Sequence, residues 1–144
     1  MDKIQSLKGM IDLIANRSDP DDFAESIFRT EDALKNIFLN FGYSEIRTPT
    51  LEDADLFKRS VGDSSDIVNK ELYSFFDKNE KNITLRPENT AGVIRSVIEK
   101  KIDANTHKFW YLGPMWRYER PQKGRYRQFN HCLLYTSPSP RDCQ

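Results

Sequence analysis

GPMWRYERPQKGRYRQF, residues 113–129, contains the end of one predicted strand, a polar loop and the start of a second strand. Residues 108–118 are aromatic and apolar at both alternating positions, which predicts a strand buried on both faces at the centre of a sheet. The polar residues 119–124 predict a loop, and residues 126–131 can return as the antiparallel partner. This unit favours an antiparallel sheet.

The same stretch concentrates positive charge in a chain whose net charge is zero, from 22 basic and 22 acidic residues. A neutral total argues against a protein that coats nucleic acid, and a compact cationic loop indicates a specific anion instead. One acid, Glu119, lies among the basic residues. These are Arg117, Arg120, Lys123, Arg125 and Arg127.

Strand alternation places side chains two residues apart on the same face. Arg117 and Glu119 should therefore point the same way, and so should Arg127 and Phe129 on the return strand. A guanidinium group for phosphate, a carboxylate for an exocyclic amine and a ring for stacking together suit a nucleotide. An Arg–Glu salt bridge beside a solvated basic loop is the simpler alternative.

A long amphipathic helix is predicted ahead of this unit. Asp19 can cap it, Pro20 suits its first turn, and Gly42 fits its end. Its apolar residues recur at helical spacing over about five turns. They are Phe23, Ile27, Leu34, Ile37, Phe38 and Phe41.

Shorter elements are predicted between the helix and the central strand. Residues 43–51 should be extended, with Pro49 restricting them to an edge or an interface, and residues 56–61 should form a short helix. Residues 72–76 and 83–85 read as a hairpin joined by a polar turn.

A further helix should follow Arg86-Pro87-Glu88, capped by Asn89 or Thr90. Ala91, Ile94, Val97 and Ile98 should share its apolar face. A glutamate at a helix start can bind an amino group, although the segment could equally be only a turn. Strands and helices are mixed without β-α-β alternation, so the predicted fold class is α+β, an antiparallel sheet flanked by helices.

The length of 144 residues suits one domain. No apolar run approaches the ~20 residues of a membrane helix, and the first residues lack a signal-peptide core. Cys132 and Cys143 both lie near the end of the chain, so no disulfide framework is expected before them. We therefore expect a cytoplasmic protein that does not associate with membranes.

Residues 113–129 closely resemble motif 2 of the histidyl-tRNA synthetases. TLRPENTAG (residues 84–92) resembles another segment of that family, GYSEIRTP (residues 42–49) resembles its motif 1, and KGM (residues 8–10) also fits. These matches occur in the family's order. The resemblance implies that residues 1–131 are part of a class II aminoacyl-tRNA synthetase catalytic domain.

For such a domain the resemblance implies that histidine and ATP form histidyl-adenylate, with loss of pyrophosphate, before transfer to tRNA(His). It implies a homodimer built through motif 1, and Mg²⁺ accompanying ATP through ligands that the sequence does not identify. The implied ATP-binding residues are Arg117 at the α-phosphate, Glu119 at the adenine amine, Arg125 at the terminal phosphates and Phe129 stacked on adenine. The implied histidine-binding residues are Glu88, Asn89, Thr90, Arg117 and His131, with Arg117 as the catalytic group.

The chain departs from the family at two site positions. Asn89 stands where the family usually has Gly, and His131 stands where it usually has Gln. The family's motif 3, second catalytic arginine and anticodon-binding domain are absent, so we expect an inactive fragment. The alternative functions are the histidine-binding regulatory subunit of ATP phosphoribosyltransferase, which need not keep the motif 2 residues, and a generic RNA-binding module.

Residues 132–142, CLLYTSPSPRD, resemble the translation of a transposase-based sequencing adapter. Two Ser-Pro pairs follow a well-patterned strand abruptly, which agrees with that interpretation. The alternative is a natural Pro-rich tail. We expect residues 132–144 to be a non-native tail. Because the adapter's first base would complete codon 131, we also expect His131 to replace a native Gln.

Overall fold

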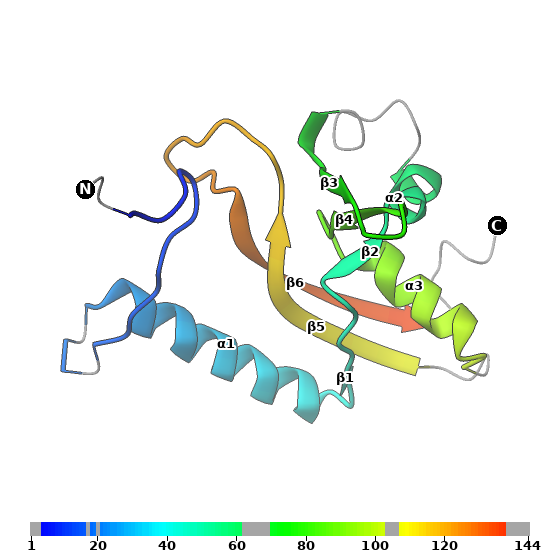
Figure 1. Cartoon of the computed structure of the whole chain (residues 1–144). Helices are drawn as coiled ribbons and strands as arrows, with labels where there is room; N and C mark the ends of the chain where they lie inside the picture. Colours follow the sequence, from blue (N-terminus) through cyan, green and yellow to red (C-terminus); the bar gives the residue numbers. More distant parts are fainter. Residues whose placement is uncertain (1–3, 17, 20, 62–69, 103–106, 138–144) are drawn as a thin grey trace.

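The computed structural model describes residues 4–16, 18–19, 21–61, 70–102 and 107–137. Helices and strands alternate irregularly along these residues (Figure 1). The elements are α1 (Phe23–Asn40), β1 (Ser44–Glu45), β2 (Leu51–Asp53), α2 (Ala54–Val61), β3 (Tyr73–Phe76), β4 (Asn82–Leu85), α3 (Thr90–Glu99), β5 (His107–Trp116) and β6 (Gln128–Ser137).

The described strands form two sheets, each with three strands. In the first sheet β5 lies between β1 and β6, which confirms the prediction of a central strand. β6 pairs antiparallel with β5, whereas β1 pairs parallel with it over two residues. The second sheet is antiparallel, in the order β2-β4-β3, and contains the predicted hairpin. The predicted α+β class is confirmed.

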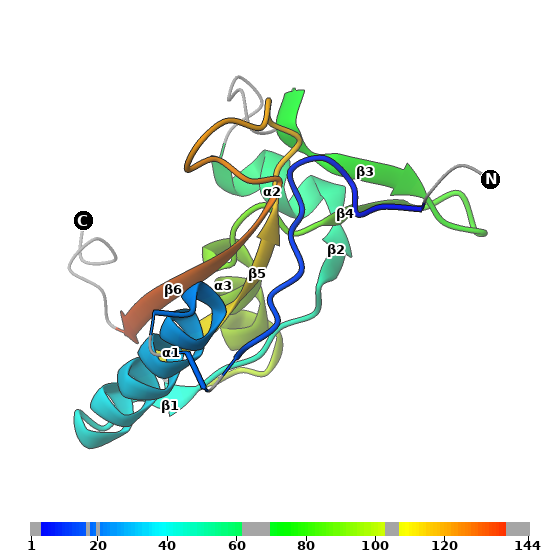
Figure 2. The ribbon, with the colours of Figure 1, turned by 90° about the vertical axis from the view of Figure 1, so that its left-hand side faces the viewer.

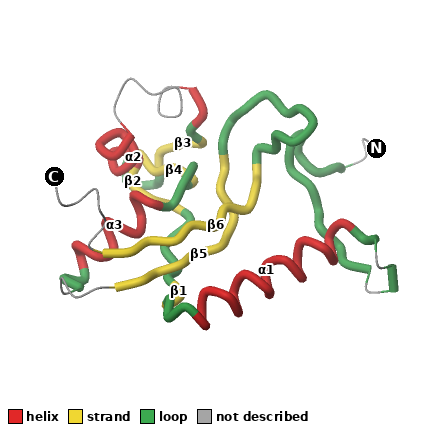
Figure 3. Tube along the Cα trace, turned by 180° about the vertical axis from the view of Figure 1, so that it is seen from behind, coloured by secondary structure: helices red, strands yellow, loops and turns green. Residues whose placement is uncertain are grey.

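Helices cover both faces of the β5–β6 pair. α1 lies along one face, and α3 lies on the other (Figures 1 and 3). On the α1 side Trp110 packs against Phe38, with ring centroids 5.4 Å apart. On the α3 side Tyr111 and Met115 pack against Val93. Burial on both faces explains the continuous apolar pattern of this strand.

α1 begins later than predicted. Its cap is Asp22, whose carboxylate accepts a hydrogen bond from the Glu25 N–H at 2.7 Å. Asp19 is not the cap because its carboxylate accepts from the Asp21 N–H in the preceding turn, at 3.0 Å. Pro20 lies outside the described residues. The predicted end is confirmed, since Gly42 follows the helix with a φ of +76°.

Replacing the cap should measurably destabilise the fold. We expect Asp22→Ala to lower the free energy of unfolding by about 1 kcal/mol, the usual scale for losing an N-cap side chain. Asp19→Ala is the matched control, because this carboxylate does not cap the helix. Urea denaturation of both variants checks the prediction, and an equal loss in both would contradict it.

The predicted apolar face of α3 is right for Ala91 and Val97 and wrong for Ile94 and Ile98. Val93 is fully buried and Ala91 is 4% exposed, but Ile94 and Ile98 are 41% and 70% exposed. Val97 packs on the core as predicted. Packing Val93 onto Tyr111 and Met115 sets the rotation of the helix and turns Ile94 and Ile98 outward.

β6 is displaced from its predicted bounds. It begins at Gln128 rather than Tyr126, and it continues beyond His131 to Ser137. Within this extension Cys132 pairs with Leu112, and Leu133 packs against the core. The strand continues because ladder hydrogen bonds come from the backbone and β5 provides a partner along the whole length.

The smaller elements agree closely with prediction. α2 begins two residues before the expected residues 56–61, and β3 and β4 form the expected hairpin. The Asp77 carboxylate stabilises the turn by accepting from the N–H groups of Asn79 and Lys81. Among the described helices, none is long and apolar enough to cross a membrane.

Candidate nucleotide and amino-acid site

The four residues predicted to bind ATP come together around one cavity. It has a volume of about 300 Å³ and lies where the β5–β6 loop meets the strand ends. The loop arches away from the sheet in Figure 1. The cavity is lined by Arg117, Glu119, Gly124, Arg125, Tyr126 and Phe129.

Arg117 is held by both its backbone and its side chain. Its N–H donates to the Arg127 carbonyl at 2.9 Å, and its Nε donates to the Pro87 carbonyl at 3.0 Å. The guanidinium carbon lies 5.2 Å from the centroid of the Phe129 ring. Only Nε is used in the side-chain bond, so the terminal nitrogens can bind an anion.

A tight turn, rather than strand alternation, places Glu119 beside Arg117. β5 ends at Trp116, and the Glu119 N–H then donates to the Arg117 carbonyl at 2.9 Å. Glu119 Oε2 lies 3.4 Å from Arg125 Nε without forming a hydrogen bond. The salt bridge that we considered as an alternative therefore involves Arg125, and the buried oxygen keeps its capacity to accept a bond.

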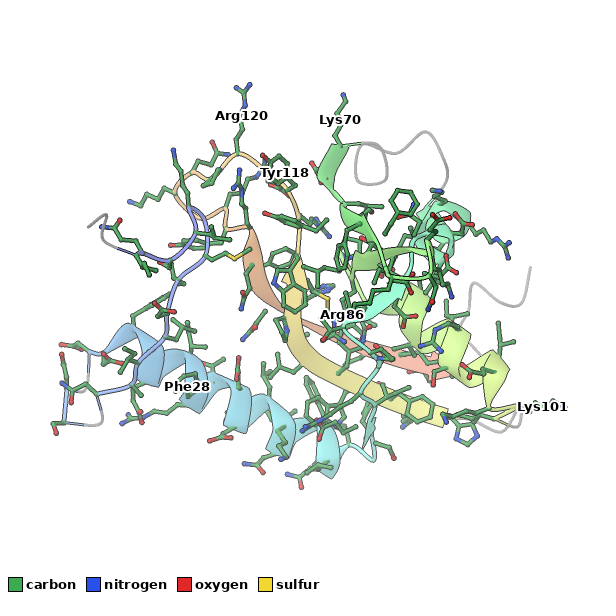
Figure 4. The ribbon with its side chains drawn as sticks, viewed as in Figure 1. Phe28, Lys70, Arg86, Lys101, Tyr118 and Arg120 are labelled. Atoms are coloured by element: carbon green, nitrogen blue, oxygen red, sulfur yellow. The ribbon has the colours of Figure 1, made fainter. Side chains whose placement is uncertain are left out.

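Arg127 does not share the cavity with Phe129, which corrects the prediction from alternation. Its guanidinium lies 4.4 Å from the centroid of the Tyr118 ring, and its Nε donates to the Glu119 carbonyl at 3.1 Å. It precedes β6, so strand geometry does not apply to it. Arg120 extends outward from the loop (Figure 4).

Glu88 caps α3, where Asn89 or Thr90 was expected to do so. Its carboxylate accepts from the N–H groups of Thr90 at 2.6 Å and Ala91 at 3.1 Å. The side chain of Asn89 makes no capping bond. A carboxylate at a helix N-terminus is stabilised by the helix dipole, and its remaining lone pairs can accept from an ammonium group.

Asn89 is buried, and its side chain is directed at the segment after β1. Its Oδ1 accepts a hydrogen bond from the Thr48 hydroxyl. Its φ of −125° is negative, so the backbone conformation does not require glycine at this position.

His131 lies on β6, where it pairs with Gly113 of β5. Its ring makes an edge-on contact with Tyr111, with centroids 6.0 Å apart. Burial lowers the pKa of His131, the positive charge of Arg117 lowers it further, and Glu88 acts in the opposite direction. Arg117 is tied to the segment that contains Glu88 by the bond from its Nε to the Pro87 carbonyl.

Sequence reasoning missed Tyr111, whose ring contacts that of His131. It is 3% exposed, and its hydroxyl has no hydrogen-bond partner among the described residues. Burial raises the pKa of Tyr111 to about 12. Strand alternation provides the signal that could have found it, because Tyr111 shares a face with Met115.

The low pKa of His131 predicts acid sensitivity. The unfolded chain takes up this proton near the ordinary pKa of 6.5, whereas the folded chain does so only at lower pH. Stability should therefore fall as the pH drops through 6.5 towards the folded-state pKa. His131→Gln should lose less stability than the unmodified chain between about pH 7 and about pH 5. Urea titrations at several pH values measure the difference, and parallel losses would contradict it.

The described residues contain no group of three His, Cys, Asp or Glu side chains close enough to hold a metal ion.

Comparison with known proteins extends these observations. Residues 18–132 match the family model described as histidyl-tRNA synthetase. The chain is 52% identical over 132 residues to a histidine–tRNA ligase of Legionella pneumophila, covering 90% of the chain and 29% of that protein. It is 51% identical over 129 residues to the ligase of Nitratiruptor, covering 88% and 30%. The chain therefore spans about 30% of the length of these relatives.

Two solved structures share the fold. The histidyl-tRNA synthetase of S. aureus superposes with a TM-score of 0.69 at 36% identity, covering 92% of this chain and 28% of that one. A Bacillus halodurans protein, titled an ATP phosphoribosyltransferase regulatory subunit/histidyl-tRNA synthetase, gives 0.70 at 23% identity, covering 93% and 33%. The second similarity shows the fold alone.

The fold and these matches define a fragment of a class II aminoacyl-tRNA synthetase. Within that class, the chain belongs to the histidyl-tRNA synthetase family.

Proposed function

We propose that residues 1–131 are the N-terminal part of a catalytic domain that activates histidine with ATP and charges tRNA(His). The observation that carries this proposal is the position of Arg117. It lines the cavity with Glu119 and Phe129, and its Nε donates to the carbonyl of Pro87, the residue before Glu88. One guanidinium group can therefore contact both reacting molecules.

The proposed reaction joins two anionic groups. The histidine carboxylate attacks the α-phosphorus of ATP, the bond to the bridging oxygen breaks, and pyrophosphate leaves. The terminal nitrogens of Arg117 would neutralise the charge that develops on the α-phosphate. Because Pro87 and Phe129 hold the guanidinium in place, little reorganisation is needed as that charge grows.

The rest of the cavity suits the remainder of ATP. The buried oxygen of Glu119 can accept from the adenine amine, and the Phe129 ring can stack on the base. Arg125 is exposed at the cavity edge, where it can reach the terminal phosphates after releasing Glu119. ATP binding would thus replace the Glu119–Arg125 ion pair with two ligand contacts.

The amino-acid part of the proposed site lies beside the start of α3. Glu88 can accept from the α-ammonium group of histidine while it caps the helix, and Thr90 supplies a hydroxyl next to it. Residue 131 and Asn89 complete the proposed set. Mg²⁺ would arrive with ATP and would shield its phosphates.

We propose that the complete enzyme acts in the cytoplasm as a homodimer. The cysteine-free sequence before Cys132 favours a cytoplasmic location. The homodimer is supported by apolar side chains of α1 that are exposed to solvent, including Phe23 at 62% and Ile37 at 47% exposure. Phe28 of the same helix is marked in Figure 4.

The test of this proposal separates binding from catalysis. The 144-residue chain should bind ATP in equilibrium dialysis, because the cavity residues are present. It should not catalyse histidine-dependent pyrophosphate exchange, since it spans about 30% of its relatives and provides only part of the transition-state contacts. Exchange by the purified chain would contradict the second expectation.

The regulatory subunit of ATP phosphoribosyltransferase remains the second candidate, because the Bacillus halodurans protein shares the fold. A chain of that type would bind histidine without needing the nucleotide cavity. Absence of ATP binding together with retained histidine binding would favour it.

We further propose that residues 132–144 are non-native and that the native residue 131 is Gln. The family match ends at residue 132, which supports this division. A neutral amide also offers a fixed donor and acceptor beside the substrate, whereas a histidine would titrate. An uninterrupted sequencing read across the locus decides the point, and a His codon followed by a continuous reading frame would overturn it.

A further inference from the structure

The N-terminal segment lies against the loop that forms the nucleotide cavity. Residues 4–14 pass beside the β5–β6 loop in both Figure 2 and Figure 3. The carbonyl of Gly9 accepts from the Arg127 N–H at 2.7 Å and from the Gln128 N–H at 3.4 Å. These bonds link the start of the chain to the residues that immediately precede and begin β6.

The contact at this position requires glycine for two reasons. The φ of Gly9 is +87°, which L-residues rarely adopt. A Cβ there would lie 2.9 Å from Pro121 Cγ and 3.0 Å from Arg127 Cγ. Both of those side chains belong to the loop or its return, so any larger residue would push the segment and the loop apart.

Much of the apolar surface of this segment stays in solvent, since Ile4, Leu7 and Ile14 are 98%, 68% and 81% exposed. Met10 and Leu13 are half-buried. Among the described residues, the backbone hydrogen bonds that join the segment to the β5–β6 loop are those accepted by the Gly9 carbonyl.

Arg127 transmits the contact to the cavity. Its carbonyl accepts from the Arg117 N–H, and its Nε donates to the Glu119 carbonyl. Its guanidinium also lies over Tyr118. A shift of Arg127 would thus move the backbone of the two cavity residues that face the phosphate and the base.

We propose that Gly9 is a positioning residue of the nucleotide site, acting through Arg127 on Arg117 and Glu119. This inference rests on the proposed function, since it assumes that the cavity binds ATP. It adds the N-terminal segment to a site that motif 2 otherwise forms. Gly9 itself touches no substrate.

The test compares two glycines in the 144-residue chain. Gly9→Ala should weaken ATP binding on the order of 10-fold or more, because small displacements of positioned groups are costly. Gly42→Ala is the matched control. Its φ is +76°, but a Cβ there would meet nothing within 4 Å, so it shares the backbone strain without the collision. Equilibrium dialysis with ATP gives the dissociation constants, and thermal melting reports the stability of each variant.

We expect similar melting temperatures for the two variants and weak ATP binding in Gly9→Ala alone. A chain that lacks residues 1–12 should reproduce the loss, which keeps the test decisive if Gly9→Ala does not fold. Equal ATP binding in Gly9→Ala and Gly42→Ala, or full binding without residues 1–12, would show that Gly9 does not position the site. The proposed function would be unaffected by that result. Absence of binding by the unmodified chain would overturn the proposed function, and the inference with it.

Discussion

Arg117→Ala in the full-length enzyme is expected to lower the rate of histidyl-adenylate formation by about 10²–10³-fold, the scale for losing one preorganised charge-stabilising group. Arg117 is the cavity residue that also bonds to Pro87, next to Glu88 on the proposed amino-acid side. The loss should appear mainly in kcat, because the charge on the α-phosphate grows in the transition state. Pyrophosphate exchange with saturating histidine and ATP measures it.

Arg117→Lys should recover little of that rate. A lysine lacks the planar fork, and it cannot bond to the Pro87 carbonyl through Nε while presenting two further nitrogens to an anion. Arg120→Ala is the matched control, because Arg120 extends outward from the same loop (Figure 4). Full activity in Arg117→Lys would show that charge without geometry suffices, and a comparable loss in Arg120→Ala would point to general loop electrostatics.

Met115→Ala is expected to destabilise the chain by about 2–5 kcal/mol, through lost burial and the cavity left behind. Met115 is fully buried, packs with Val93 and Tyr111, and pairs across the ladder with Phe129. Such a loss is a large part of the total stability of a domain, about 5–15 kcal/mol. Denaturant titration measures it through the transition midpoint.

Met115→Leu is the control for that variant. It keeps nearly the same volume and should cost less than about 1.5 kcal/mol. If Met115→Ala unfolded at the same denaturant concentration as Met115→Leu, the site would not be the packed centre that the structure describes.

Local patterns in the sequence were sufficient to predict most of the helices and strands and the family to which the chain belongs. The end of α1 at Gly42 and the hairpin of β3 and β4 followed from turn residues, which act over a few positions. The centrality of β5 followed from apolar residues on both faces. Family resemblance in residues 113–129 identified four residues that the structure gathers around one cavity.

Competition for hydrogen bonds decided details that local patterns left open. Asp22 rather than Asp19 caps α1, and Glu88 rather than Asn89 caps α3. Several nearby side chains could fill each role by type. The choice depends on where the preceding segment is held by the rest of the fold, which no local pattern records.

Most of the helices and strands, the family and the chemical groups of the candidate site followed from the amino-acid sequence. How those groups are held follows from packing between distant segments. Arg127 turns from the cavity to Tyr118, Asn89 bonds to Thr48, and Gly9 docks on the loop. Periodicity and turn chemistry act between residues that are near neighbours in the chain. The Asn89 and Gly9 contacts join residues far apart in the chain, and they exist only after the sheets and helices have packed.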